Sequence, residues 1–577
     1  MSAAHGGPPE LVLGPLLRYV DETRATVWVE TDRPCEVVVD VGGGEDASSG
    51  RAPTFGVHGH HYALVVVRGL PSGAVLPYRV SLDGHVVWPA EDGPGGPGSP
   101  FPPSTVRTRG ETGRHGAGHL RLSFGSCRRA GGDSAPELRA LGADALAALA
   151  LRMAATAEDS WPHVLLLVGD QVYADMPSEP LRRRLREAHR DSLDADPDVR
   201  DEIGTFEEYT WLYRETWGTP EVRWLLSTVP SCMLLDDHDL RDDWNTSRTW
   251  RERVSAQPWW RDRVVGAFAS YWVHQHLGNL SPDDIGRDPV WRALHAERDD
   301  AGRSRVLDDF AWRADAEPTS ARWSFRRDLG DVRLVAVDSR CSRVLDPRAR
   351  RMVDRTEWAW VREQVLDADG RAPRHVLLAT TLPVFLPRAL HDLEGWDEAV
   401  AEGAWGRRWA RAGERLRQAA DLEHWAAFRA SFAEFTDLLA ELCSPARAGA
   451  PRSVLVLSGD VHCSYSAEVR LPGVDPARTA VHQLVMSPFR NPMERLLRAA
   501  IVGFETRPLR SVLARLARSA GVAADGVSWR VTHGPWFANG VTTLDVAGER
   551  ATAEVDHALV VGGRQLLERT ADVPVQG

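Results

Sequence analysis

Six apolar segments of the chain each end in polar or ionisable side chains that could do chemistry. The segments are 121–127, 163–170, 231–239, 332–340, 375–383 and 453–462. The side chains at their ends are Cys127 and Arg128, Asp170, Asp236 to Asp239, Asp338 to Arg340, Thr380 and Thr381, and Asp460 with His462. A single acid after a strand is more often a solvated loop residue or a helix cap. Strands of an open α/β sheet end at a common edge where ligands bind, so the recurrence of Asp, His and Cys favours one shared site.

The residue types in these clusters favour a metal site. Crowded carboxylates repel one another and raise their pKa values unless a cation lies among them, and the chain has no lysine. Asp and His suit Fe, Mn, Zn or Co, and an oxygen-rich site also admits Ca²⁺ or Mg²⁺. Thiolate and phenolate ligands must lose a proton, and trivalent iron stabilises such anions best. Asp170 and Tyr173 lie three residues apart in GDQVYAD, so both side chains can point into the same loop crevice.

The elements that must position these residues differ along the chain. Residues 1–90 contain short β-branched runs separated by turn signals, which predicts a small β-sandwich of the fibronectin or immunoglobulin type. Residues 91–118 are rich in Gly and Pro and predict a linker. Residues 119–577 alternate apolar runs with helical stretches, which predicts an α/β domain. Two helical features are expected there: an apolar stripe at helical spacing over 421–443, interpreted as core packing, and one helix over about 494–520.

Composition limits the class of protein. The chain has 577 residues, 43% hydrophobic and 26% charged, which excludes disordered, collagen-like and disulfide-knot proteins. Its net charge of -12 disfavours non-specific binding to nucleic acid. Six scattered cysteines, no secretory or twin-arginine signal and no apolar run near 18 residues predict a cytoplasmic protein without a membrane span. No pattern indicates an oligomeric state.

Five motifs carry a resemblance to a known family. The segments FGSCR (124–128), GDQVYAD (169–175), LLDDHDLRDDW (234–244), AVDSR (336–340) and SGDVHCSYSAE (458–468) resemble, in this order, the PhoD-like (alkaline phosphatase D) family of the metallophosphoesterase superfamily. The resemblance implies a four-layer α/β/β/α sandwich around a multinuclear metal site that hydrolyses phosphate esters. The first 90 residues also resemble the β-sandwich that precedes the catalytic domain in such proteins.

The resemblance also implies roles for single residues. It assigns Cys127, Tyr173 and His462 to Fe³⁺, Asp237 and Asp460 to a divalent cation, and Asp170 to a bridge between the two metals. Ca²⁺ is the divalent ion that the family implies, with Mn²⁺ or Zn²⁺ as alternatives. His238 matches the histidine that contacts the substrate phosphate and protonates the leaving oxygen after attack by a metal-bound hydroxide. Asp170 and His238 are therefore the expected catalytic residues, and the expected partner is a small phosphomonoester or phosphodiester.

The sequence departs from the family pattern at two places. DDHD followed by Asp242 and Asp243 stands where the family has DDHE and an asparagine pair. The isolated metal-binding histidine of the superfamily's fourth motif has no secure counterpart. The candidates His375, His391 and His424 are predicted to be structural.

Several interpretations stay open at the level of sequence. Arg128 and Arg340 follow strand ends and could clamp phosphate oxygens, or could form an ion pair with a neighbouring Asp. Residues 390–445, rich in Trp and Arg, could form a lid over the site or an ordinary packed insertion. The alternatives to a phosphoester hydrolase of small molecules are a non-catalytic metal-dependent scaffold protein and a phosphodiesterase of the phospholipase D type.

Overall fold

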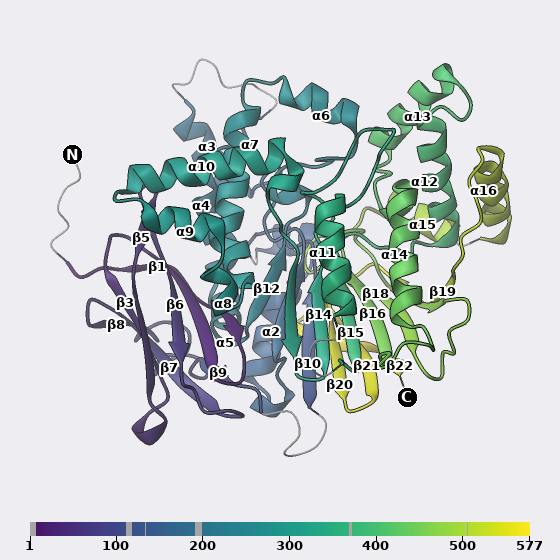
Figure 1. The fold of residues 1–577 in the computed structure, drawn as a ribbon. Helices are drawn as coiled ribbons and strands as arrows, with labels where there is room; N and C mark the ends of the chain where they lie inside the picture. Colours follow the sequence, from purple (N-terminus) through teal and green to yellow (C-terminus); the bar gives the residue numbers. More distant parts are fainter. Residues whose placement is uncertain are drawn as a thin grey trace.

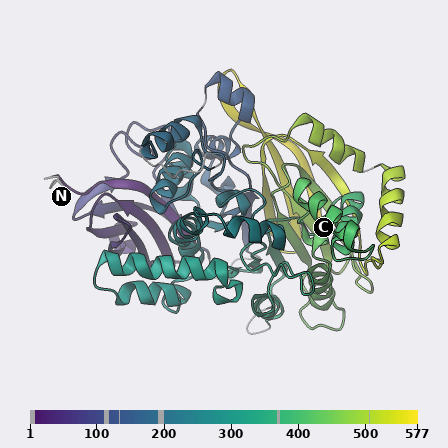
Figure 2. The same cartoon turned by 90° about the horizontal axis from the view of Figure 1, so that it is seen from above.

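Two β-sheets packed face to face form the centre of the larger part of the molecule, and helices cover both outer faces (Figure 1). The computed structural model describes residues 7–110, 118–132, 134–190, 199–367, 372–504 and 506–576. Seen from above, the N-terminal β-sandwich lies at one end and the two large sheets at the other (Figure 2). The arrangement is the predicted α/β/β/α sandwich preceded by a small all-β region.

The two large sheets contain thirteen strands. The six-stranded sheet has the order β12 (Ser231–Leu234), β11 (Val164–Val168), β10 (His119–Gly125), β20 (Gly540–Ala547), β21 (Arg550–Val561) and β22 (Arg564–Gln576). The seven-stranded sheet has the order β13 (Phe325–Leu329), β14 (Val332–Ala336), β15 (His375–Ala379), β16 (Ser453–Ser458), β18 (Ala480–Val485), β17 (Ser464–Arg470) and β19 (Ser528–Trp536). Strands β10, β11 and β12 are parallel, and so are β14, β15, β16 and β18. Each parallel set therefore presents its carboxyl ends at one edge.

Successive side chains of a strand point alternately into two hydrophobic cores, one between the sheets and one beneath the outer helices. In β16, Leu455 and Leu457 lie between the sheets, whereas Val454 and Val456 face the outer helices. Because both faces of the sheet are covered, the strand is apolar throughout, which is why its run is continuous in the sequence.

Helices cover the outer faces. The face of the seven-stranded sheet packs against α11 (Arg355–Leu366) and α14 (Arg429–Leu442). The face of the six-stranded sheet packs against α2 (Ala145–Ala154), and α4 (Phe206–Trp217), α5 (Pro220–Thr228) and α7 (Trp260–Tyr271) belong to the same hydrophobic core. The apolar stripe predicted over 421–443 is buried in the core beneath α14, as expected. The remaining helices are α1 (Ala135–Leu141), α3 (Glu179–Ala188), α6 (Arg248–Ser255), α8 (Pro282–Ile285), α9 (Pro289–Ala296), α10 (Asp300–Ala316), α12 (Arg388–Ala401), α13 (Arg407–Ala419), α15 (Arg495–Phe504) and α16 (Arg507–Ser519).

The single helix predicted over about 494–520 is wrong, because the segment forms α15 and α16. Thr506 has an extended backbone and precedes the first residue of α16, and Pro508 lies in its first turn. Proline lacks a backbone N–H and is tolerated only in the first turn of a helix, so a helix containing Pro508 must begin there. No helix in the described ranges is long and apolar enough to span a bilayer.

The N-terminal β-sandwich consists of two further sheets. One has the order β1 (Leu11–Val20), β2 (Arg24–Thr31), β6 (His60–Arg68) and β5 (Phe55–Val57). The other has the order β4 (Ser48–Pro53), β3 (Glu36–Val41), β7 (Val75–Leu82) and β8 (His85–Trp88), with β9 (Thr105–Arg107) paired to β7. Strand β9 comes from the Gly/Pro-rich range 91–118, so part of that range belongs to the sandwich.

A buried arginine joins the sandwich to the larger part. Arg18 of β1 is fully buried and donates hydrogen bonds to the carbonyl oxygens of His274, Gln275 and Ser231, at 2.6, 2.7 and 3.3 Å. Ser231 is the first residue of β12, the strand that leads to Asp236–Asp239. The sandwich therefore supports an element that positions part of the predicted site.

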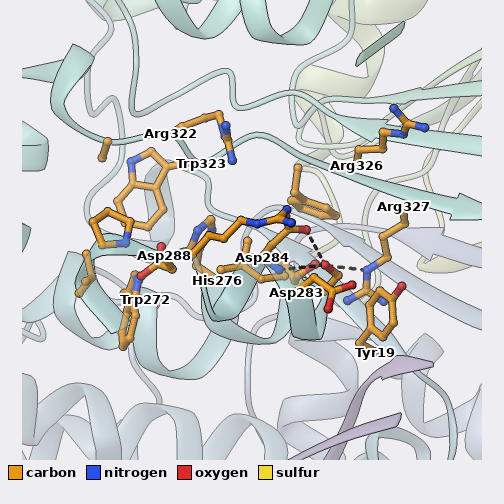
Figure 3. A pocket seen from close by; sticks show the side chains of 18 of the residues that line it. Tyr19, Trp272, His276, Asp283, Asp284, Asp288, Arg322, Trp323, Arg326 and Arg327 are labelled. Carbon is orange, nitrogen blue, oxygen red and sulfur yellow. Dashed lines mark hydrogen bonds and ion pairs between the residues drawn. The ribbon is translucent and has the colours of Figure 1, made fainter. Parts of the chain in front are cut away.

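A cavity of about 1070 Å³ lies at this junction (Figure 3). It is lined by Tyr19 of β1 and by Trp272, His276, Trp323 and Arg327 of the larger part. None of the described residues that we predicted for the site lines it, so the site lies elsewhere.

Candidate metal centre and active site

The predicted site residues converge where the parallel strands of both large sheets end. Cys127 follows β10, Asp170 follows β11, Asp237 follows β12, and Asp460 and His462 follow β16. Three sets of side chains bring potential ligand atoms within 4.8 Å of one another: Cys127, Asp170 and His462; Asp170, Asp237 and His238; and Asp236, Asp237 and Asp460. The structure thus places residues from both sheets around one point.

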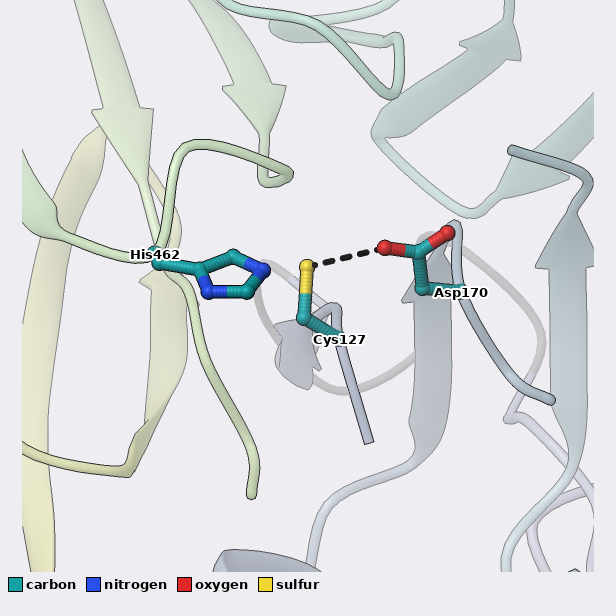
Figure 4. Close-up of side chains that lie close together, drawn as sticks. All are labelled: Cys127, Asp170 and His462. Carbon is teal, nitrogen blue, oxygen red and sulfur yellow. Dashed lines mark hydrogen bonds between the residues drawn. The ribbon is translucent and has the colours of Figure 1, made fainter. Parts of the chain in front are cut away.

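The first ligand group consists of Cys127, Asp170, Tyr173 and His462. In Figure 4 the Cys127 thiol lies between the His462 ring and the Asp170 carboxylate, and its Sγ is 3.3 Å from Asp170 Oδ2. The Tyr173 hydroxyl donates to the same Oδ2 at 3.2 Å and accepts a hydrogen bond from Asn491 Nδ2 at 3.0 Å. Asn491 was not predicted, because it follows β18 outside the motifs.

Four site residues have left-handed backbone conformations. The φ angles are 58° at Cys127, 51° at Asp170, 66° at Asp460 and 49° at His462. This region is uncommon for residues other than glycine, and each instance costs on the order of 1 kcal/mol or more. The neighbouring Gly169 also has positive φ, and a Cβ atom there would lie 2.6 Å from Asp236 Oδ2. These tight turns aim the side chains at one another, and such strain is typical of functional sites.

Burial shifts the pKa values of the first ligand group, whose acidic side chains form no ion pair with any described residue. Burial, reinforced by Asp170 and Asp460, raises the pKa of the Cys127 thiol well above its usual value. Burial likewise raises the pKa of Asp170 and of Tyr173. Burial, together with the charges of His238 and Arg129, lowers the pKa of His462 to about 3, which leaves a neutral imidazole able to bind a metal.

An unpaired carboxylate oxygen in the first ligand group also indicates a metal site. Asp170 Oδ1 is buried and accepts no hydrogen bond from any described residue. A buried acceptor without a partner costs free energy, and a bound cation would remove that cost and also favour the ionised thiol, phenol and carboxyl. The donors therefore fit a metal ion.

The second ligand group consists of Asp236, Asp237 and Asp460, and it contains a permanent cation. Arg340 is fully buried and forms ion pairs with Asp236, with Asp237 Oδ1 at 3.2 Å and with Asp460 Oδ1 at 3.7 Å. It also pairs with Glu423 Oε1 at 2.6 Å. The guanidinium is thus surrounded by carboxylates, which is the ion-pair alternative that the sequence left open.

Residues between α13 and α14 also belong to the site. Glu423 pairs with Arg343 at 2.9 Å as well as with Arg340. His424 Nδ1 bonds to Glu394 at 2.6 Å, and its Nε2 lies 3.8 Å from Asp460 Oδ2 without a hydrogen-bond partner among the described residues. Sequence patterns assigned no role to Glu423 and predicted a structural one for His424. The segment 390–445 therefore contacts the site.

His238 is positioned beside the first ligand group. Its Nδ1 donates to Asp175 Oδ2 at 2.8 Å, and its ring stacks on Tyr173 with centroids 4.4 Å apart. Burial opposes the charged imidazole, but Asp175 and Asp170 outweigh it and raise the pKa of His238 well above its usual value. Asp175 also accepts a hydrogen bond from the Asp242 N–H at 2.9 Å. Asp175 is the last residue of the motif GDQVYAD, so this motif could have identified it as a site residue.

Comparison with known families agrees with this geometry. The family model described as PhoD-like phosphatase matches residues 148–496, more than half of the chain. The chain belongs to the PhoD-like phosphatase family. Residues 8–106 match a second model, described as Domain of unknown function (DUF7800), and no curated protein matches the chain by sequence.

One solved structure shows the same fold, and a second has a lower similarity. A structure titled "Structure of PhoD" has a TM-score of 0.60 and 12% sequence identity, covering 99% of this chain and 91% of the other. A purple acid phosphatase, PPD1 from yellow lupin (Lupinus luteus) seeds, has a TM-score of 0.45 and 9% identity, covering 99% of this chain and 75% of the other. Membership of the PhoD-like family implies a metal-dependent hydrolase of phosphoric esters.

In this PhoD-like chain, Arg128 has a structural role. Its Nη2 forms an ion pair with Asp144 Oδ2 at 2.6 Å, and its Nη1 donates to the Thr216 carbonyl oxygen at 2.6 Å. The Nε atom donates to Asp144 as well, so all three nitrogens have partners and the side chain is buried. Phosphate binding by Arg128, which we expected as one of two roles, does not fit this geometry.

Two predicted clusters support loops of the PhoD-like domain. Asp338 accepts hydrogen bonds from the backbone N–H groups of Arg340, Cys341 and Ser342. Thr381 Oγ1 bonds to Ser339 Oγ at 2.8 Å. Both clusters fix the loop that carries Arg340, so their contribution to the site is indirect.

Proposed function

We propose that this PhoD-like protein hydrolyses small phosphate monoesters or diesters, with His238 as the acid that protonates the leaving oxygen. The observation that carries the proposal is the position of the His238 imidazole, oriented by Asp175, next to a cluster of buried side chains that could bind metal ions. Fe³⁺ would be held by Cys127, Tyr173 and His462. The divalent ion would be held by Asp237 and Asp460, and Asp170 would contact both metals. Ca²⁺ is our assignment for the divalent ion, with Mn²⁺ and Zn²⁺ as alternatives.

The bound cations would supply an activated water molecule and neutralise the phosphate oxygens. The protein's own groups do the rest. Asp175 fixes the His238 ring through Nδ1 and stabilises its charged form, so a proton is available at Nε2. Transfer of that proton to the departing alkoxide contributes on the order of 10² to 10⁴ in rate. Arg340 keeps Asp237 and Asp460 in place and takes no part in the transfer.

The test combines metal analysis with a substrate panel. The purified protein should contain iron and a second metal and should release p-nitrophenol from p-nitrophenyl phosphate, from bis-p-nitrophenyl phosphate or from both. A metal-containing protein that releases nothing with any added metal would favour the non-catalytic scaffold alternative. Release confined to phospholipid headgroups would favour the phospholipase D type. The cytoplasmic location stays a prediction.

A further inference from the structure

Three arginines near the ligand groups differ in their partners. Arg128 is paired with Asp144, and Arg340 is surrounded by carboxylates. Arg129 is half-buried, and within the described residues its guanidinium makes no hydrogen bond or ion pair. Its Cζ atom lies 6.0 Å from the centroid of the Tyr173 ring. Arg129 is therefore a cation beside the first ligand group whose donors are not used by any described residue.

Backbone hydrogen bonds fix the position of Arg129, whose side chain has no hydrogen-bond or ion-pair partner among the described residues. Its N–H donates to the Arg490 carbonyl oxygen at 3.1 Å, and the Arg490 N–H donates to the Cys127 carbonyl oxygen at 3.1 Å. The Arg490 side chain in turn donates to the carbonyl oxygens of Gly131 and Gly132, at 2.6 and 2.7 Å. The segment from Cys127 to Gly132 is thus held in place by hydrogen bonds, so the position of Arg129 is set by the same loop that carries the Cys127 ligand.

A guanidinium that is partly removed from water is stabilised by a nearby anion. Burial removes water from its donors, and Arg129 Nε is already shielded and has no partner among the described residues. The carboxylates of the second ligand group are paired with Arg340, so they do not neutralise Arg129. The planar fork of a guanidinium matches two oxygens of a phosphate, which makes a bound phosphate group the partner that the chemistry favours.

We propose that Arg129, not Arg128, binds the phosphate group of the substrate at this site, and that it favours monoesters over diesters. The inference rests on the proposed function and names its substrate class. A monoester carries one more charged non-bridging oxygen than a diester, so a guanidinium in addition to the metal ions stabilises it more. Arg129 is a substrate-binding residue in this scheme, and no bond is made or broken at it.

The experiment compares Arg129→Met and Arg129→Lys with Arg139→Met, which changes an exposed arginine of α1. Inorganic phosphate is the probe, and its dissociation constant is measured by calorimetry on the metal-loaded proteins. Arg129→Met should raise this constant by about 10- to 100-fold, as expected for the loss of charge-assisted hydrogen bonds. Arg129→Lys should give a smaller increase, and Arg139→Met none. The fall in kcat/KM of Arg129→Met should be larger for p-nitrophenyl phosphate than for its bis ester.

The outcomes distinguish this inference from the proposed function. If Arg129→Met binds phosphate as tightly as the unaltered protein, the inference is overturned even when the enzyme is active. It is also overturned if Arg129→Met loses metal, since the arginine would then act through the ligands. If the unaltered protein hydrolyses no phosphoester but loses phosphate affinity on Arg129→Met, the proposed function fails and Arg129 still binds phosphate.

Discussion

The two ligand groups of the site differ in how their negative charge is balanced. The first group places Cys127, Asp170 and Tyr173 in contact and contains no cation that pairs with them among the described residues. The second group contains Arg340, which pairs with all three of its carboxylates. The first group therefore depends on a bound metal to ionise its thiol and phenol, whereas the second is partly neutralised by the protein itself. This difference predicts that a substitution confined to one group affects one metal, whereas a substitution of Asp170, which belongs to two ligand sets, affects both.

Asp170→Asn should have the largest effect, because Asp170 belongs to two of the candidate ligand sets. We expect loss of both metals and a fall in turnover of roughly 10³-fold or more, since the remaining donors cannot keep two cations close together. Metal analysis measures the metal content, and phosphoester assays measure the turnover. Asp437→Asn, an exposed carboxylate on α14, is the control and should change neither. An Asp170→Asn protein that retains one metal would show that the groups bind independently.

Removal of the metals should make stability depend on pH in a defined direction. Burial raises the pKa of Asp236 to about 6 and that of Asp239 to about 7, from a usual value of 3.8. The folded, metal-free protein then binds more protons than the unfolded chain, so its stability is lost as the pH rises through about 4 to 7. A tenfold difference in proton affinity between the folded and unfolded states corresponds to about 1.4 kcal/mol, so the loss of unfolding free energy amounts to a few kcal/mol.

Thermal unfolding with and without chelator, at about pH 5 and about pH 8, measures this effect. The chelated protein should be more stable at the lower pH. The metal-loaded protein should show the opposite trend, because protons compete with metal for the ligands. If the stability of the chelated and metal-loaded proteins changed with pH in the same way, the assignment of a metal to the Asp236–Asp239 cluster would be wrong.

His238→Asn tests which residue in the cluster is the acid. If His238 donates a proton and binds no metal, the variant should keep its metals and lose about 10²-fold in turnover. The loss should be smaller for a p-nitrophenyl ester than for an alkyl phosphate ester, because nitrophenolate needs little protonation to leave. Because Asp170, Asp237 and His238 also form a possible ligand set, a variant that loses metal would identify His238 as a ligand instead.

A pair of substitutions compares the two groups directly. Tyr173→Phe should abolish the visible charge-transfer band of an iron phenolate. Glu423→Gln should leave that band unchanged and weaken binding of the divalent ion by about 10-fold, since it removes a negative charge that pairs with Arg340 beside Asp237. Absorption spectra and metal titrations measure the two effects. A band that disappears in Glu423→Gln would show that the two groups are coupled.

The sequence allowed the prediction of residues that follow strands directly. Cys127, Asp170 and Asp460 each come two residues after a buried strand, so the apolar run that predicts the strand also locates the residue. Glu423 and His424 could not be located in this way, because they approach the site from the segment between two helices. Arg128 and Arg129 are neighbours in the sequence, and the contacts with Asp144, the N-cap of α2, and with the Thr216 carbonyl oxygen make the first of them structural. Contacts between distant elements decide such cases.

The same limit applies to the fold. The parallel strands of both large sheets were predictable because they are buried on both faces and are apolar throughout. Strand β22 has only three buried residues and several charged ones, so it has no apolar run that would predict a strand. Strand β9 has only three residues and lies in a Gly/Pro-rich range, so the sequence did not predict it. It is recognised only by its pairing with β7.

The position of Glu423 between α13 and α14 has a consequence for engineering. This segment contacts the metal site through Arg340 and, at His424, approaches Asp460. An exchange of residues 390–445 with a relative, intended to change the substrate, would therefore also replace a counter-charge of the metal centre. A chimera that keeps Glu423, His424 and Glu394 while exchanging the exposed faces of α12 and α13 would change the outer surface of this segment and conserve its contacts with Arg340 and Asp460.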